Sequence, residues 1–223
     1  HGLIYTFGPT FRAEKSKTRR HLSEFWMIEP EMAFYDLEMN MDLAEDMLKS
    51  IVSEVLEKYH HELALLERDT SSLKRLVEKD FVRIKYDDAV DILNSDKTAK
   101  VLDELIQQRK AEKEELIREQ DAIQKEHGSA KKWRKKQIEK RIIDIHTRVD
   151  QIEEDLRNIP RWKKSAQEFI WGSDFGGSDE TVLTMQFDVP VMVTHWPAEI
   201  KAFYMERDET DTYALGVDIL APE

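Results

Sequence analysis

Two side chains near the start of the sequence, and the loop between them, could together bind a nucleoside triphosphate. Arg12 carries a guanidinium that stays charged at any relevant pH and forks onto phosphate oxygens. Phe25 offers an aromatic face, and stacking of a base on such a face contributes on the order of 1–3 kcal/mol. Residues 12–21 hold five Lys and Arg side chains against one acid, Glu14. A second interpretation stays open, in which Arg12 and Glu14 form a surface pair across two strands and Phe25 belongs to the core.

The elements that must position these side chains are two strands. Residues 4–11 and 24–28 are rich in aromatic and β-branched side chains, which is typical of strands. The cationic segment between them, residues 13–23, is longer than the roughly two to five residues of most hairpin loops. Loops of this length often carry function. We therefore expect a β-hairpin with a functional loop.

The same stretch resembles a known signature. Residues 11–14 read FRAE, residues 20–22 read RHL and residues 24–34 read EFWMIEPEMAF. Together they resemble the second signature motif of class II aminoacyl-tRNA synthetases. Residues 195–205 read HWPAEIKAFYM, and their KAFYM form is similar to the asparaginyl branch of the aspartyl/asparaginyl subgroup.

The resemblance implies roles for residues of the hairpin. It implies that Arg12 contacts the α-phosphate and the amino-acid carboxylate, and stabilises the charge that develops as this carboxylate attacks. Glu14 would contact the substrate end or the adenylate, so that Arg12 and Glu14 are the implied catalytic residues. Phe25 would stack on adenine. The remaining implied ATP contacts lie in the loop: Arg20, His21 and Leu22.

Two acidic residues receive further roles from the resemblance. Glu29 would accept a hydrogen bond from the side-chain amide of asparagine and repel the carboxylate of aspartate. The alternative is a strand-end glutamate in a surface pair. Asp218 matches a family acid that lies near the magnesium ion (Mg2+) bound to ATP, and hard carboxylate oxygen suits this ion.

The implied activity is that of an asparagine-tRNA ligase. Such an enzyme joins ATP and asparagine into an adenylate and transfers the asparaginyl group to tRNA(Asn), as a homodimer in the full-length protein. Two alternatives stay open: a noncatalytic synthetase-like scaffold, in which the ATP site is vestigial, and an aspartyl-tRNA synthetase of the same subgroup.

The resemblance covers about residues 4–93 and 169–222, while residues 97–160 match nothing general to the family. A second acid, a glycine-rich segment and the third motif are expected beyond Glu223. The first motif and an anticodon-binding β-barrel are expected upstream. We therefore expect a partial catalytic domain that is not active by itself.

The composition limits the class of protein. Apolar runs such as residues 189–193 are much shorter than the roughly 20 residues of a membrane span, so we expect a cytoplasmic chain with no membrane contact. The absence of cysteine excludes disulfides and thiolate metal sites. His60, His61 and His195 lack the spacing of a metal site. A net charge of −12 argues against wholesale wrapping by nucleic acid.

The middle of the chain predicts helices. Apolar residues at helical spacing predict one amphipathic helix over residues 42–65, capped by Asp42. A short helix is expected at residues 86–93, after residues 82–84. The composition then shifts to Lys, Glu, Gln and Arg, which indicates an insertion.

The insertion has the clearest periodicity in the chain. Apolar residues alternate spacings of four and three, as in the seam of a coiled coil: Ile138, Ile142, Ile145, Val149, Ile152, Leu156 and Ile159. A weaker pattern over residues 97–127 and a break at Gly128 predict an antiparallel helical hairpin that ends at Pro160. Each arm would extend roughly 45 Å. The cationic residues 131–136 could contact tRNA phosphates, although a solvated helix start is the favoured interpretation.

Further strands are expected at residues 190–195, 202–206 and 213–219. The sequence thus predicts an α+β fold, an antiparallel sheet with flanking helices that is interrupted by an antiparallel helical hairpin. The predicted division is residues 1–94 and 166–223 for the two parts of the catalytic core, and residues 95–165 for the helical insertion.

Overall fold

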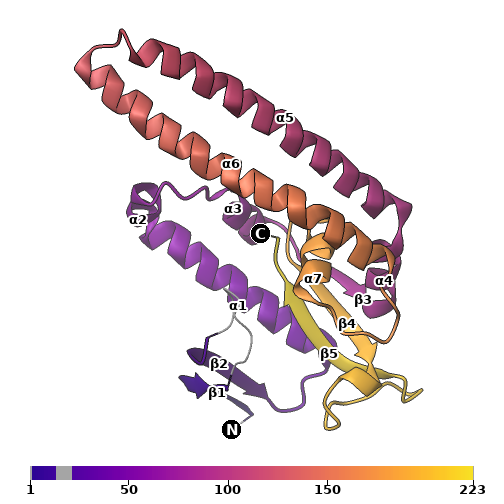
Figure 1. Cartoon of the computed structure of the whole chain (residues 1–223). Helices are drawn as coiled ribbons and strands as arrows, with labels where there is room; N and C mark the ends of the chain where they lie inside the picture. The colour runs from indigo at the N-terminus through magenta and orange to yellow at the C-terminus, as the bar shows by residue number, and fades with distance from the viewer. Residues whose placement is uncertain (1, 14–21, 223) are drawn as a thin grey trace.

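The structure is a computed structural model that describes residues 2–13 and 22–222. Figure 1 shows small sheets with helices beside them, and two long helices that project away from the sheets. This arrangement confirms the α+β class with an inserted helical hairpin. Within the described residues, no helix is both long and apolar enough to span a bilayer.

The first sheet is the expected β-hairpin. Strands β1 (Leu3–Phe11) and β2 (Glu24–Met32) pair antiparallel, with Thr10 opposite Phe25 and Thr6 opposite Glu29. Alternation of side chains along each strand separates the hairpin into two faces. The face opposite Phe25 carries exposed aromatic side chains, among them Phe7 and Trp26, whose ring centroids lie 5.0 Å apart.

The second sheet differs from the expected pattern. Its order is β3 (Val82–Lys85), β4 (Val191–Pro197) and β5 (Tyr213–Leu220), with β4 and β5 antiparallel. Strands β3 and β4 run parallel, so the expectation of a wholly antiparallel sheet is wrong for this pair. Parallel neighbours need a long crossover connection, and the helical hairpin lies within the connection between β3 and β4.

The strand expected at residues 202–206 does not form. The segment between β4 and β5 holds a short 3-10 helix, η1 (Ala198–Ile200), followed by turns. The Asp208 carboxylate accepts hydrogen bonds from the backbone N–H groups of Thr212 and Tyr213, at 3.0 and 2.9 Å. A hydrogen bond from the Thr210 hydroxyl, together with these backbone bonds, lowers the pKa of Asp208 to about 2. At residues 202–205 a separate turn takes the place of the strand, and in it the Met205 N–H donates to the Ala202 carbonyl at 3.0 Å.

The predicted helix over residues 42–65 begins earlier and is interrupted. Helix α1 (Leu37–Lys58) starts at Asp36, whose side chain accepts from the Met39 N–H at 2.8 Å. Helix α2 (His60–Leu65) follows a non-helical Tyr59, and α3 (Ser71–Glu78) packs on α1. Asp42 is therefore not the cap that the sequence predicted.

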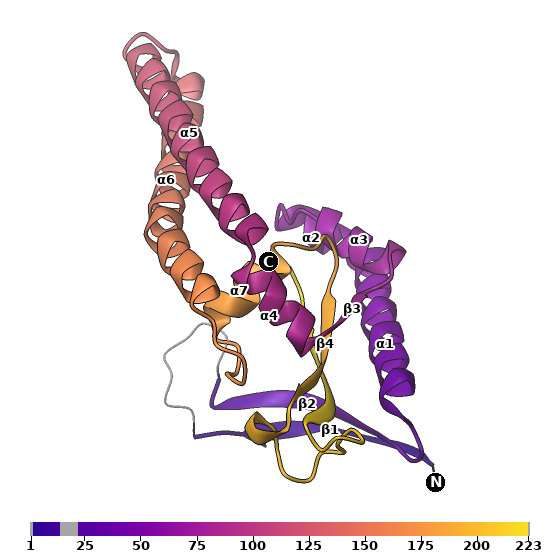
Figure 2. The same ribbon diagram turned by 90° about the vertical axis from the view of Figure 1, so that its right-hand side faces the viewer.

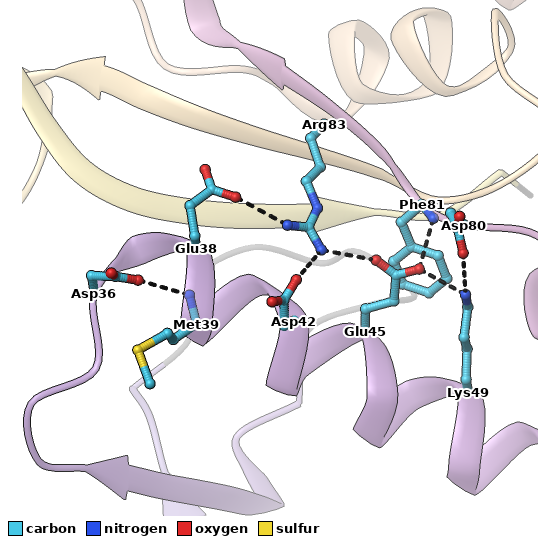
Figure 3. A network of polar contacts seen from close by, with 9 residues as sticks. All are labelled: Asp36, Glu38, Met39, Asp42, Glu45, Lys49, Asp80, Phe81 and Arg83. Carbon is cyan, nitrogen blue, oxygen red and sulfur yellow. Dashed lines mark hydrogen bonds and ion pairs between the residues drawn. The ribbon is translucent and has the colours of Figure 1, made fainter.

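Asp42 instead belongs to an ionic network between α1 and β3 (Figure 3). Arg83 on β3 bonds Asp42, Glu38 and the buried Glu45. Glu45 also accepts from the Phe81 N–H at 2.9 Å and pairs with Lys49 at 2.7 Å. Burial by itself would raise the pKa of Glu45, but the bonds from Lys49, Phe81 and Arg83 outweigh it and lower this pKa. The network fixes α1 to the second sheet.

The core lies between the second sheet and the helices α4 (Tyr86–Asn94) and α7 (Gly177–Thr184). Its centre is aromatic: the Tyr86 ring stacks on Phe175 at 5.4 Å and lies 5.1 Å from the Trp196 ring. The Tyr86 hydroxyl donates to the Ser173 carbonyl at 2.6 Å, so the buried oxygen has a partner. The helix expected at residues 86–93 is confirmed.

The helical hairpin consists of α5 (Asp96–His127) and α6 (Lys132–Gln167), and Figure 2 shows it rising away from the sheets. The predicted seam is confirmed, since Ile138, Ile145 and Ile152 are buried. Ion pairs join the two arms: Arg109–Asp155, Lys113–Glu153, Glu112–Arg148, Glu119–Arg141 and Glu126–Arg134. At a rise of ~1.5 Å per residue, the arms extend about 50 Å.

The expected end of the hairpin at Pro160 is wrong, because α6 continues through this proline. Proline removes one backbone hydrogen bond of a helix. On either side of it, however, Ile159 and Ala166 are fully buried in the main core. This burial holds the last turns of α6 in place. The division of the chain into three segments stays a proposal.

Candidate nucleotide-binding site

The hairpin places the predicted nucleotide-binding residues on one face. Phe25 and Glu29 lie on alternate positions of β2, and Thr10 is opposite Phe25. Arg12 follows Thr10 by two residues, which returns its side chain to the same face. The Arg12 guanidinium carbon lies 5.5 Å from the centre of the Phe25 ring. A charged fork and an aromatic ring thus point to the same side.

The end of the hairpin is closed beside these residues. The Arg12 N–H donates to the Ser23 carbonyl at 3.0 Å, one residue beyond the last paired position of each strand. This bond fixes where the loop leaves the sheet. The Arg12 guanidinium lies over the Phe25 ring, so a base that stacks on this ring would displace the guanidinium toward the phosphate groups of the same ligand. Phe25 itself is partly buried, a degree of burial that is compatible both with a stacking face and with a core residue.

Glu29 lies further along the same face. It is four residues from Phe25, which corresponds to about 13 Å on a strand. Its carboxylate accepts a hydrogen bond from the Thr6 hydroxyl at 3.1 Å, across the pair of strands. Both side chains are exposed. The face therefore has a nucleotide end near Phe25 and an acidic end near Glu29.

Gly8 lies between these two ends, opposite Met27. A Cβ atom placed on Gly8 would meet no heavy atom within 4 Å. The β1 side of this face is therefore open at Gly8, while on β2 the Met27 side chain lies between Phe25 and Glu29.

Three of the implied contacts fall outside the described residues: Glu14, Arg20 and His21. Leu22, the fourth loop contact, is exposed just before β2 begins. The surface pair between Arg12 and Glu14 also depends on a residue outside the described part.

Asp218 lies on the second sheet, on β5, opposite Val193. Its Oδ2 atom is 2.8 Å from the Lys201 Nζ, and this ammonium group also lies 3.7 Å from the centre of the Trp196 ring. A second acid, Asp174, is 3.9 Å from the same nitrogen. Lys201 thus holds one oxygen of Asp218. The motif of residues 195–205 contains both Trp196 and Lys201, but the sequence did not indicate that Lys201 contacts Asp218.

The described residues contain no group of three or more His, Cys, Asp or Glu side chains that could enclose a metal ion. A magnesium ion commonly takes one or two carboxylates and completes its shell with phosphates and water. One carboxylate such as Asp218 fits that pattern. His60, His61 and His195 are in no such group within the described residues.

A family model described as tRNA synthetases class II (D, K and N) matches residues 2–222. The chain belongs to this family. The matched range includes the helical hairpin. The prediction that the resemblance covers only residues 4–93 and 169–222 is therefore too narrow.

Other members of the class II synthetase family are similar over the whole chain. The asparagine–tRNA ligase of Sorangium cellulosum is 45% identical over 223 residues, which are 100% of this chain and 37% of the relative. That of Koribacter versatilis is 39% identical, over 100% of this chain and 36% of the relative. This chain therefore spans about a third of the length of these relatives.

A solved structure in the same family agrees with the fold. The crystal structure of asparaginyl-tRNA synthetase from Pyrococcus horikoshii complexed with asparaginyl-adenylate has a TM-score of 0.65 and 29% identity to this chain. The likeness covers 100% of this chain and 35% of that one.

Proposed function

We propose that the full-length protein is an asparagine-tRNA ligase. The observation that carries this proposal is the position of Arg12 beside Phe25 on one open face of the hairpin. Membership of the class II synthetase family supports it, as do relatives that carry the name asparagine–tRNA ligase. The substrates are ATP, asparagine and tRNA(Asn), and the proposal includes a cytoplasmic homodimer.

In the proposed first step, the asparagine carboxylate attacks the α-phosphorus of ATP and pyrophosphate leaves. Phe25 stacks on adenine and orients the nucleotide, while the Arg12 guanidinium binds the α-phosphate. Negative charge accumulates on the phosphate oxygens during this attack, and a fixed cation stabilises it. In the second step, a hydroxyl at the 3′ end of the tRNA attacks the carbonyl carbon, and AMP leaves.

Magnesium, when bound with ATP, would supply positive charge against the phosphates, and Asp218 is the carboxylate that we propose to meet it. The part played by Lys201 is to orient Asp218 through a hydrogen bond to its Oδ2 atom.

The proposal is tested by ATP–pyrophosphate exchange with the full-length protein. We expect exchange that depends on asparagine, with reactions lacking an amino acid as the background. Exchange supported by aspartate and not by asparagine would replace the proposal with an aspartyl-tRNA synthetase. No amino-acid-dependent exchange would favour the noncatalytic scaffold.

Two variants test whether ATP–pyrophosphate exchange depends on Arg12. Arg12→Gln should lower the exchange rate by roughly 100-fold or more, because a preorganised group that stabilises developing charge is lost. Arg118→Gln is the matched control, since Arg118 is exposed on α5 and pairs only with Glu114 among the described residues. Equal rates for the two variants would exclude Arg12 from the reaction.

A further inference from the structure

The tip of the helical hairpin concentrates positive charge in an acidic chain. We define the hairpin tip as residues 125–140, where α5 ends and α6 begins. It carries seven Lys and Arg side chains against two Glu, whereas the chain as a whole has a formal net charge of −12. Both views place the tip at the end of the hairpin remote from the sheets (Figures 1 and 2). The charge is therefore local and is presented at a distance from the nucleotide-binding face.

In the part of the chain that the structure describes, unpaired cations are more closely spaced at the tip than along the arms. Several Arg and Lys side chains of the arms pair with carboxylates of the opposite helix, and at the tip Arg134 is held by Glu126 at 2.8 and 3.1 Å. Outside the tip, the lysines of α5 that have no ion pair among the described residues are spread out, at Lys97, Lys100 and Lys110. No ion pair within the described residues involves four lysines of the tip: Lys131, Lys132, Lys135 and Lys136. The hairpin is thus stabilised by its paired charges and leaves these four ammonium groups free for an external anion.

An exposed aromatic ring lies among the four lysines. Trp133 is 62% exposed in the first turn of α6. An exposed indole between cations is suited to stacking on an unpaired base, while the cations contact the phosphates on either side. A membrane surface fits less well, because insertion needs several apolar side chains, and the next apolar residue of α6, Ile138, is buried.

We propose that the hairpin tip binds RNA, with the four lysines on the sugar-phosphate backbone and Trp133 on an unpaired base. This inference rests on the proposed function in one respect: the RNA is tRNA because tRNA is the substrate of an asparagine-tRNA ligase. The tip then contributes to tRNA affinity and not to the chemistry of amino-acid activation.

The test measures binding of transcribed tRNA(Asn) to the full-length protein over a range of salt concentrations. One variant replaces the four tip lysines by glutamine: Lys131→Gln, Lys132→Gln, Lys135→Gln and Lys136→Gln. Each lost phosphate contact reduces the slope of log affinity against log salt by roughly 0.7–0.9, so the loss of four contacts should make the slope shallower by about 3. Affinity at low salt should fall by roughly tenfold or more.

A matched control changes the net charge equally at other exposed lysines: Lys74→Gln, Lys97→Gln, Lys100→Gln and Lys110→Gln. We expect this variant to bind tRNA nearly as the unchanged protein does. Equal losses in both variants, or no loss in either, would overturn the proposal. Loss of binding to phosphatidylserine vesicles with unchanged tRNA binding would also overturn it and would assign the tip to a membrane surface.

The ring is tested separately from the charges. Trp133→Ala should weaken tRNA binding by roughly fivefold or more, and Trp133→Phe should retain most of the affinity. Equal affinity of the alanine and phenylalanine variants would exclude stacking.

ATP–pyrophosphate exchange with asparagine is measured on the same proteins, and it involves no tRNA. Tip variants should exchange at the rate of the unchanged protein. A tip variant that loses exchange together with tRNA binding would count against a separate RNA surface. Absence of exchange in the unchanged protein would instead contradict asparagine activation, while tRNA binding could still be compared between the variants.

Discussion

At the scale of single residues, the hairpin relies on the alternation of side chains along a strand. Arg12 shares a face with Phe25 because it lies two residues beyond Thr10, which is paired with Phe25. Glu29 shares the same face because it lies four residues from Phe25 along β2. An insertion of one residue in either strand would move part of this set to the opposite face. The spacing of these residues is therefore as important as their chemical type.

Glu29 gives the prediction at this scale. Glu29→Gln removes the negative charge that we propose to accept a hydrogen bond from asparagine and to repel aspartate. A hydrogen bond to a charged group contributes about 1.5–3 kcal/mol, so the ratio of kcat/KM for asparagine over aspartate should fall by roughly tenfold or more. The measurement is exchange with each amino acid. Glu24→Gln is the control, because Glu24 is on the opposite face of the same strand; an unchanged ratio in Glu29→Gln would remove this residue from the specificity site.

At the scale of elements, the helical hairpin is stabilised by a narrow apolar seam and by charges that pair across it. Ile138, Ile145 and Ile152 recur every seven residues and are all buried, as a coiled-coil repeat requires. The base of the hairpin joins the main core through Ile159. The tip can therefore be held at a fixed distance from the sheets.

Two isoleucines test this description. Ile145 is fully buried in the seam, whereas Ile143 on the same helix is 64% exposed. Ile145→Ala should lower the free energy of unfolding of the hairpin by about 2–5 kcal/mol, through lost burial and the cavity left behind. Ile143→Ala should change it by less than about 0.5 kcal/mol. Hydrogen exchange of α5 and α6 measures both values, and similar destabilisation by the two variants would contradict the assigned seam.

At the scale of the whole molecule, an ionic network joins α1 to β3 of the second sheet. Helix α1 directly follows the nucleotide-binding β-hairpin in the chain. Arg83 bonds three carboxylates of α1, and the buried Glu45 accepts from both a side chain and the Phe81 backbone. Without these donors the Glu45 carboxylate would be buried and unpaired, which is unfavourable. The folding of α1 is therefore coupled to that of the second sheet.

The network predicts a dependence of stability on pH. The pKa of Glu45 is lowered in the folded chain from its ordinary value of 4.5. Its stabilising contribution is therefore complete above about pH 4.5 and is lost as the pH falls through the lower folded value. Glu45→Gln should reduce the free energy of unfolding by about 1–3 kcal/mol at pH 7, and the difference from the unchanged protein should narrow below pH 4.5.

Urea denaturation of the two proteins at pH 7 and in acid measures this effect. Glu38→Gln is the matched control, because Glu38 also bonds Arg83 but its side chain is 70% exposed. We expect it to cost less than about 1 kcal/mol. A difference for Glu45→Gln that stays constant with pH would show that the carboxylate charge does not stabilise the fold.

Several features of this protein were determined by the sequence alone. The residues of the second motif, the two strands that carry them and the seven-residue seam are patterns between near neighbours in the chain. Such patterns depend on strand and helix periods, which are local properties of the backbone. The hairpin face with Arg12 and Phe25 and the buried isoleucines followed from them without knowledge of the tertiary structure.

Other features were decided only by tertiary contacts. Helix α1 starts at Asp36, and Asp42 bonds Arg83 on β3 instead of capping the helix. The contact of Lys201 with Asp218 also joins residues that are separated in the sequence. The parallel pairing of β3 with β4 depends on a connection of about a hundred residues between them. Helix α6 passes Pro160 because burial of Ile159 and Ala166 in the core outweighs one missing backbone hydrogen bond. These outcomes depend on long-range packing, which local periodicity does not encode.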